Sequence, residues 1–95
     1  MNETQLTRKI LKALRTKRGG RWVKIHGHAY QEAGISDILG CYKGTFYALE
    51  IKLPHRTDKD SYGSAIQRAF ILDIIEAGGK GKVIKTVEEA LKFVK

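Results

Sequence analysis

The chain has 95 residues, which is enough for one domain with a single core over residues 1–95 and leaves no room for a second domain. Its 18 lysine and arginine residues outnumber 10 aspartate and glutamate residues, giving a formal net charge of +8 and a pI near 9.8. This excess predicts a polyanionic partner, with nucleic acid first and an anionic membrane surface as the alternative. No apolar run approaches the roughly 20 residues that span a bilayer, so we expect no membrane-embedded segment.

Two features of the sequence predict a cytoplasmic protein. The first residues lack the apolar stretch of a signal peptide. Cys41 is the only cysteine, which excludes an internal disulfide and a cysteine-rich zinc site and is typical of a reducing compartment. No local signature marks Cys41 as a nucleophile, so we interpret it as a small core or strand residue.

The N-terminal half predicts a helix, a strand and a β-hairpin. Asn2 is a capping residue, and the apolar side chains after it recur at helical spacing up to the Gly19-Gly20 pair. Apolar and polar positions then alternate as in strands, and Lys43-Gly44 between two such runs is typical of a hairpin turn. We therefore expect a helix over residues 3–17, strands over 21–27, 37–42 and 45–53, and a loop over 28–34.

The C-terminal half predicts a loop, two helices and one more strand. Residues 54–62 are polar and contain the only proline, as expected for a loop. A helix over residues 64–77 follows and ends at Gly78-Gly79. A short strand over residues 82–85 precedes a last helix from Thr86, where Glu89 completes a capping box. The apolar face expected for the first of these helices consists of Ile66, Phe70, Ile71, Ile74 and Ile75.

The resulting order, α-β-β-β-α-β-α, predicts the fold class. A hairpin followed by a helical crossover to the last strand requires both antiparallel and parallel pairing. No internal repeat, low-complexity tract or linker divides the chain. We therefore expect an α/β fold with a mixed central sheet that is flanked by helices.

The apolar run YALEIKL, residues 47–53, contains two opposite charges. Residues two apart on a strand share a face, so Glu50 and Lys52 lie side by side. Burying an ion costs several kcal/mol even when it is paired. The pair is therefore either a partly exposed ion pair on an edge strand or part of a functional site.

A second acid precedes the same hairpin turn. Counted back from Lys43-Gly44, Asp37 lies opposite about Glu50, on the same face of the sheet. Two like charges there are destabilising unless a cation lies between them, and Mg²⁺ prefers such oxygen ligands. Lys52 is then placed to orient or deprotonate a water, or to stabilise negative charge on a phosphate. The alternative is that Asp37 is an ordinary strand-entry residue.

The segments GISD at residues 34–37 and EIK at residues 50–52 resemble the PD-(D/E)xK nuclease signature, with Ser36 where the signature has proline. With an acid on the first helix, the stretch WVKIHG and a later helix that carries Gln67, the chain resembles the virus-type replication-repair nuclease family, VRR-NUC, in its stand-alone form. The resemblance spans nearly the whole chain. It implies the restriction-endonuclease-like αβββαβ core of that superfamily.

The resemblance also implies a Mg²⁺ or Mn²⁺ site. Asp37 and Glu50 would be metal ligands together with the backbone carbonyl of Ile51. Glu3 would be the N-terminal acid that reaches the metal directly or through water. Its ordinary role would be to stabilise the start of a helix.

The resemblance implies catalytic roles for two further residues in addition to Asp37 and Glu50. Lys52 would be the catalytic lysine, and Gln67 would be the polar residue that lines the site from the following helix. Without the resemblance, Gln67 is a solvated helix residue.

Several basic residues are candidates for contact with DNA phosphates. We expect Arg8 and Lys12 on the first helix to serve this role, and Lys24 and His26 on the first strand to do so as well. The alternative for each is an ordinary solvated surface position. His26 and His28 lie two residues apart without a cysteine partner, which is weak evidence for zinc.

The sequence and the resemblance together predict a structure-selective DNA endonuclease that acts like a Holliday-junction resolvase, without a small-molecule cofactor. Branched DNA of this kind has two-fold symmetry, so a homodimer is expected. Analogy with small replication nucleases suggests a bacterial or phage-encoded protein. The alternatives are a non-catalytic basic DNA-binding module and a nuclease for flap or linear duplex DNA.

Overall fold

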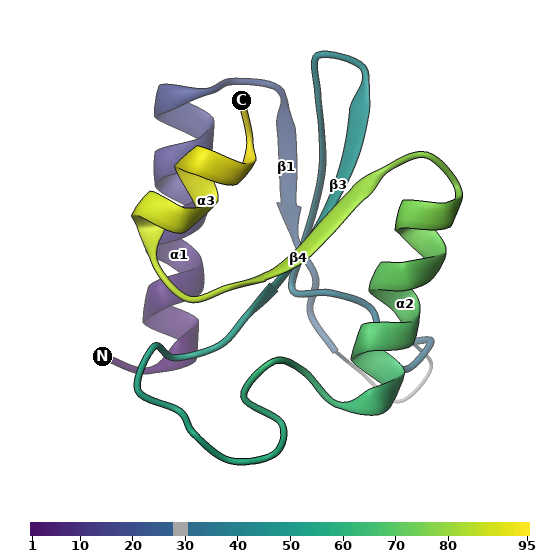
Figure 1. The fold of residues 1–95 in the computed structure, drawn as a ribbon. Helices are drawn as coiled ribbons and strands as arrows, with labels where there is room; N and C mark the ends of the chain where they lie inside the picture. Colours follow the sequence, from purple (N-terminus) through teal and green to yellow (C-terminus); the bar gives the residue numbers. More distant parts are fainter. Residues whose placement is uncertain (28–30) are drawn as a thin grey trace.

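The computed structural model describes residues 1–27 and 31–95. Its helices are α1 (Glu3–Lys17), α2 (Ala65–Glu76) and α3 (Val87–Phe93), and its strands are β1 (Arg21–Lys24), β2 (Ile38–Tyr42), β3 (Thr45–Ile51) and β4 (Lys80–Ile84). The strands form one sheet in the order β1-β2-β3-β4 (Figure 1). The first three are antiparallel, and β4 pairs with β3 in parallel after the crossover through α2. The predicted mixed sheet with flanking helices is therefore confirmed.

The elements occur in the predicted order, but the first three strands are shorter than expected, and the second begins at Ile38 rather than at Asp37. The first strand ends at Lys24 and the third at Ile51, because the ladder pairing of each strand stops there. The last strand starts two residues earlier than expected, at Lys80, which pairs with Tyr47. The longest helix has 15 residues, and no helix in the described part of the chain is long and apolar enough to cross a membrane.

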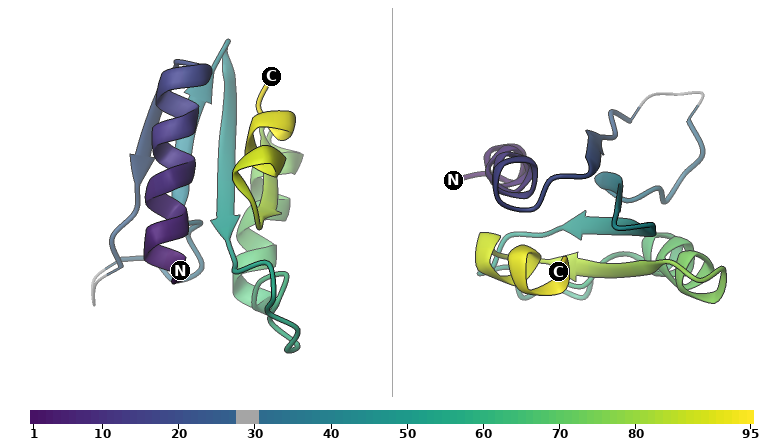
Figure 2. Two further views of the ribbon diagram at one scale, coloured as in Figure 1. Left: turned by 90° about the vertical axis from the view of Figure 1, so that its left-hand side faces the viewer. Right: turned by 90° about the horizontal axis from the view of Figure 1, so that it is seen from above.

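The main core lies between the sheet and the helix pair α1 and α3, which share one face (Figure 2). The apolar stripe expected on α1 is buried there, with Ile10 and Leu14 fully inaccessible. The rings of Trp22 and Tyr47 pack at a centroid distance of 5.7 Å. Trp22 lies across Gly40 of the neighbouring strand, where an added Cβ would overlap the indole, so this pairing requires glycine.

Among the described helices, α2 is the one that covers the opposite face of the sheet, over β3 and β4 (Figure 2). The strong apolar face predicted for this helix is only partly confirmed. Ile71 is buried, whereas Ile66 and Ile75 are 54% and 46% exposed. The reason is geometric: a single helix resting on two strands buries only a narrow stripe of its surface.

In the described part of the chain, the area of this face formed by β1, β2 and the start of β3 is open to solvent. Val23 and Phe46 are 39% and 40% exposed, and Cys41 is an exposed strand residue rather than a core residue. A shallow apolar hollow of about 310 Å³ lies among them. Arg21 and Gly40 also line this hollow, and we call its four other residues the open sheet face: Val23, Leu39, Cys41 and Phe46.

Candidate active site

The turn between β2 and β3 aligns the two central acids. Both turn residues, 43 and 44, have positive φ angles of 50° and 80°, as a two-residue type I′ hairpin requires. The register that follows pairs Ile38 with Leu49. One further step along the same register places Asp37 opposite Glu50, as the sequence predicts.

Asp37 is held by backbone contacts on both sides. Its Oδ2 accepts a hydrogen bond of 2.8 Å from the backbone N–H of Ile51, and its own carbonyl accepts one of 2.8 Å from Ile25. The preceding loop approaches α2 at Gly34, which has a φ of 86° and lies so close to Ile66 that a Cβ would not fit. These two hydrogen bonds and the packing of the preceding loop on α2 therefore position Asp37 at the site.

Glu50 is the most buried charged group of the site, with 2% of its surface exposed. It lies on the face of β3 toward α2, whereas Leu49 and Ile51 belong to the main core. Burial, followed by the nearby carboxyl group of Asp37, raises the pKa of Glu50 to about 8. Its Oε1 is buried without a hydrogen-bond partner among the described residues.

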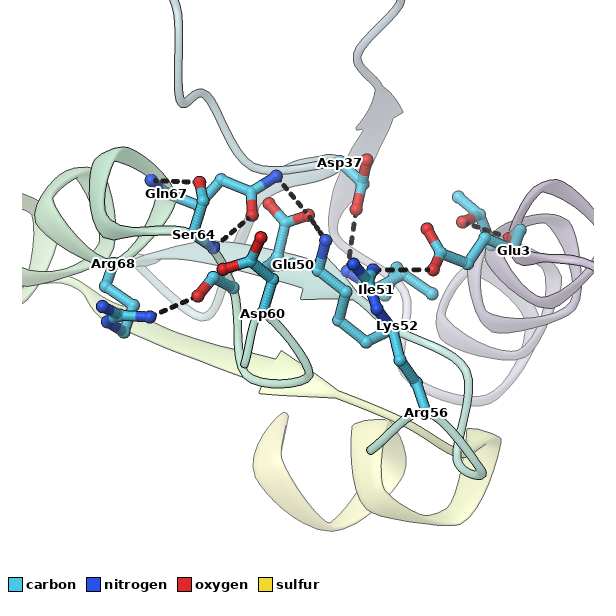
Figure 3. A network of polar contacts seen from close by, with 12 residues as sticks. Glu3, Asp37, Glu50, Ile51, Lys52, Arg56, Asp60, Ser64, Gln67 and Arg68 are labelled. Carbon is cyan, nitrogen blue, oxygen red and sulfur yellow. Dashed lines mark hydrogen bonds and ion pairs between the residues drawn. The ribbon is translucent and has the colours of Figure 1, made fainter. Parts of the chain in front are cut away.

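The other oxygen of Glu50 has two partners (Figure 3). The ammonium of Lys52 lies 3.7 Å from Glu50 Oε2, and the amide of Gln67 donates to the same oxygen over 3.1 Å. Gln67 also accepts from the backbone N–H of Ser64 as part of a capping box that starts α2. The cap and the site thus share one side chain, so Gln67 is not a plain solvated residue.

Glu3 reaches the same region from the first turn of α1, on the side of the site opposite α2 (Figure 3). Its Oε2 lies 3.5 Å from Nη1 of Arg56, a residue of the loop after β3. Nε of Arg56 also contacts both carboxylate oxygens of Asp58, at 2.9 and 3.1 Å. Sequence reasoning missed Arg56. The available signal was an arginine only four residues after Lys52, separated from it by a proline that turns the chain.

The four residues expected to contact DNA do not join these acids. Arg8, Lys12 and His26 are exposed and Lys24 is half-buried. None of the four has a hydrogen bond or ion pair to an acid of the site in the described part of the chain. His28, the second histidine of the weak zinc hypothesis, lies outside the described residues.

A divalent cation fits the donors that are present. No group of three or more His, Cys, Asp or Glu side chains within residues 1–27 and 31–95 is arranged to hold a metal, and the third acid, Glu3, faces Arg56. Asp37 and Glu50 nevertheless adjoin, and Glu50 has a buried oxygen without a partner and a raised pKa. A cation between the two carboxylates would remove both penalties.

Comparisons with known proteins support the fold. No protein-family model and no curated protein sequence matches the chain. Among solved structures, the chain is similar to Hjc, a Holliday junction resolvase from the archaeal hyperthermophile Archaeoglobus fulgidus, with a TM-score of 0.65 and 23% sequence identity. The match covers 87% of this chain and 67% of Hjc. It confirms the restriction-endonuclease-like fold, whereas the VRR-NUC resemblance stays a prediction.

Proposed function

We propose that the protein is a divalent-metal-dependent DNA endonuclease that cuts branched DNA in the manner of a Holliday-junction resolvase. The observation that carries this proposal is the buried Glu50, which adjoins Asp37 and Lys52 at the end of β3. A fold shared with a solved Holliday junction resolvase adds support. Membership of the VRR-NUC family, in a bacterium or phage, belongs to the same proposal.

In this proposal, Asp37, Glu50 and the carbonyl of Ile51 hold Mg²⁺ or Mn²⁺, which supplies Lewis-acid chemistry for phosphodiester hydrolysis when bound. Lys52 holds the attacking water or stabilises the charge that grows on the phosphate. Its ammonium group is 3.7 Å from Glu50, close enough to act at the same phosphate. Gln67 orients the Glu50 carboxylate by donating to Oε2.

DNA would be bound through its phosphates. The net charge of +8 supplies the attraction, and Arg8, Lys12, Lys24 and His26 are the proposed contacts on α1 and β1. Contacts of this kind position a backbone without reading base sequence. Selection would therefore depend on the shape of the DNA, as expected for a nuclease of branched substrates.

We further propose a homodimer with two active sites. A four-way junction is two-fold symmetric, and a chain of 95 residues covers little DNA by itself. The open sheet face is the proposed contact, because it is apolar and adjoins α2 on the sheet surface that no second helix covers. A second copy of the chain would cover the open sheet face beside α2.

Cleavage of a labelled four-way junction tests the enzyme proposal. Wild type, Lys52→Ala and the exposed control Lys92→Ala are compared in Mg²⁺, in Mn²⁺ and in EDTA, beside flap and linear duplex DNA. We expect paired, symmetric nicks at the junction that need metal and Lys52 but not Lys92. Cutting of flap or duplex alone would reassign the substrate. Tight binding without cutting in either metal would favour the non-catalytic binding module.

A further inference from the structure

The loop after β3 returns Arg56 to the active site through a tight turn. The backbone N–H of Arg56 donates to the carbonyl of Leu53 over 3.2 Å. Pro54 occupies the second position of this turn, where its fixed φ favours the bend. The turn begins directly after Lys52, so the path of the chain places the guanidinium near the candidate catalytic groups.

Arg56 is held there by two carboxylates, those of Asp58 and of Glu3, and Figure 3 shows the contact with Glu3. Glu3 Oε2 is 3.5 Å from Nη1, a long contact between side chains that are 40% and 29% exposed. Asp58, in the same loop, accepts from Nε. Nη2 has no partner among the described residues. Ion pairs this exposed contribute little to folding stability. The guanidinium can therefore exchange these carboxylates for another anion at low cost.

We propose that Arg56 is a phosphate-binding residue for the DNA substrate, which Glu3 and Asp58 hold in position in the free protein. The inference rests on the proposed function. The planar guanidinium presents paired N–H groups that match two phosphate oxygens. Glu3 lies beside Arg56 and in the same network as the candidate metal ligands, so a phosphate bound at those ligands would be on the same side of the site as Arg56.

Glu3 would have two alternative cationic partners. In the free protein its carboxylate faces Arg56, and in the metal-bound protein the same carboxylate would help to hold the cation. The guanidinium of Arg56 would then lose this partner and become available to the incoming phosphate. DNA and metal would therefore each favour the binding of the other.

Salt-dependent binding to an uncut four-way junction tests the role of Arg56. The measurements use fluorescence anisotropy in Mg²⁺, with every variant built on Lys52→Ala so that the DNA stays intact. Arg56→Ala should weaken binding about tenfold and reduce the slope of log K against log salt by about 0.9, the loss of one phosphate contact. Arg56→Lys should keep the slope, and Lys59→Ala is the matched control in the same loop.

Each outcome decides between two roles for Arg56. Unchanged affinity and slope in Arg56→Ala, or an equal loss in Lys59→Ala, would overturn the proposal and leave Arg56 as a tether for the loop. Absence of junction binding both in the Lys52→Ala protein and in wild type in EDTA, where the DNA also stays intact, would overturn both this inference and the nuclease proposal. Absence of cleavage by wild type would overturn only the nuclease activity, because the salt slope is measured without cutting.

Glu3→Gln provides a second test through a double-mutant cycle in EDTA. If Glu3 holds Arg56, the Glu3→Gln change should raise metal-free DNA affinity severalfold in the presence of Arg56 and less in Arg56→Ala. Equal gains in the two backgrounds would show a general loss of negative charge and overturn the holding role.

Discussion

The side-chain amide of Gln67 lies 3.1 Å from Oε2 of Glu50, and its carbonyl oxygen accepts the backbone N–H of Ser64 over 2.8 Å. One residue therefore starts α2 and orients a candidate metal ligand. The start of the helix and the geometry of the site are coupled through this side chain, and substitutions can separate the two roles.

Gln67→Glu keeps an acceptor for the cap but replaces the amide donor with a carboxylate beside Glu50. We expect cleavage of the four-way junction to fall about tenfold or more, as for the loss of a hydrogen bond to a charged group. Ser64→Ala is the control, since it weakens the helix start by about 1 kcal/mol without removing the donor to Glu50. Initial cleavage rates and melting temperatures of both variants show whether the rate loss comes from the lost hydrogen bond to Glu50 or from a weaker helix start. Equal rate losses in the two variants would assign Gln67 a purely structural role.

The raised pKa of Glu50 makes the metal-free protein less stable at higher pH. Between pH 4.5 and about 8 the folded protein keeps a proton on Glu50 that the unfolded chain has lost. The free energy of unfolding therefore falls as pH rises through this range, and the loss is complete above about pH 8. Urea unfolding in EDTA at several pH values should show the decline, and Glu50→Gln should flatten it. A decline of the same size in Glu50→Gln would contradict this origin.

Divalent metal should reverse that loss. Mg²⁺ or Mn²⁺ binds the ionised carboxylates, so the rise in melting temperature should be larger at pH 8 than at pH 6. At a metal concentration of 100 times Kd, the expected gain is about 2.7 kcal/mol. Asp37→Asn should abolish the shift, whereas Asp73→Asn, on the exposed side of α2, should retain it. A full shift in Asp37→Asn would place the metal elsewhere.

The alignment of the two central acids is predictable from sequence because it depends on local rules. Lys43-Gly44 favours a two-residue turn, and strand periodicity then fixes which side chains face each other. The proximity of Glu50 to Lys52 follows from the same period of two. The mixed sheet follows from the order of the elements.

The remaining contacts depend on the path of the chain in three dimensions. Arg56 meets Glu3 across 53 positions of sequence, and no periodic pattern in a polar loop predicts that approach. The exposure of Ile66 was also missed, because an apolar side chain at helical spacing gives no information on how wide a surface will cover the helix. The double role of Gln67 required knowing that α2 begins beside the end of β3.

Substitutions at the two residues of the β2–β3 turn should change the stability of the protein in opposite directions. Lys43 has a φ of 50°, which asparagine adopts more readily, so Lys43→Asn should stabilise the protein by about 0.5–1 kcal/mol. Gly44→Ala, at a φ of 80°, should destabilise it by about 1 kcal/mol or more. Each kcal/mol corresponds to about 4–8 °C in melting temperature for a domain of this size. Stabilisation by Gly44→Ala would contradict the type I′ geometry.

The open sheet face should mediate dimer formation. Val23 is an apolar strand residue with 39% exposure, and a charge at this position would be buried without a partner in the dimer. We expect Val23→Glu to yield a monomer in sedimentation velocity, with wild-type circular dichroism and weaker binding to the four-way junction. Leu72→Glu, on the exposed side of α2, is the matched control and should stay dimeric. A wild type that sediments as a monomer at all concentrations would contradict the homodimer, and a monomeric Leu72→Glu would move the contact from the sheet to α2.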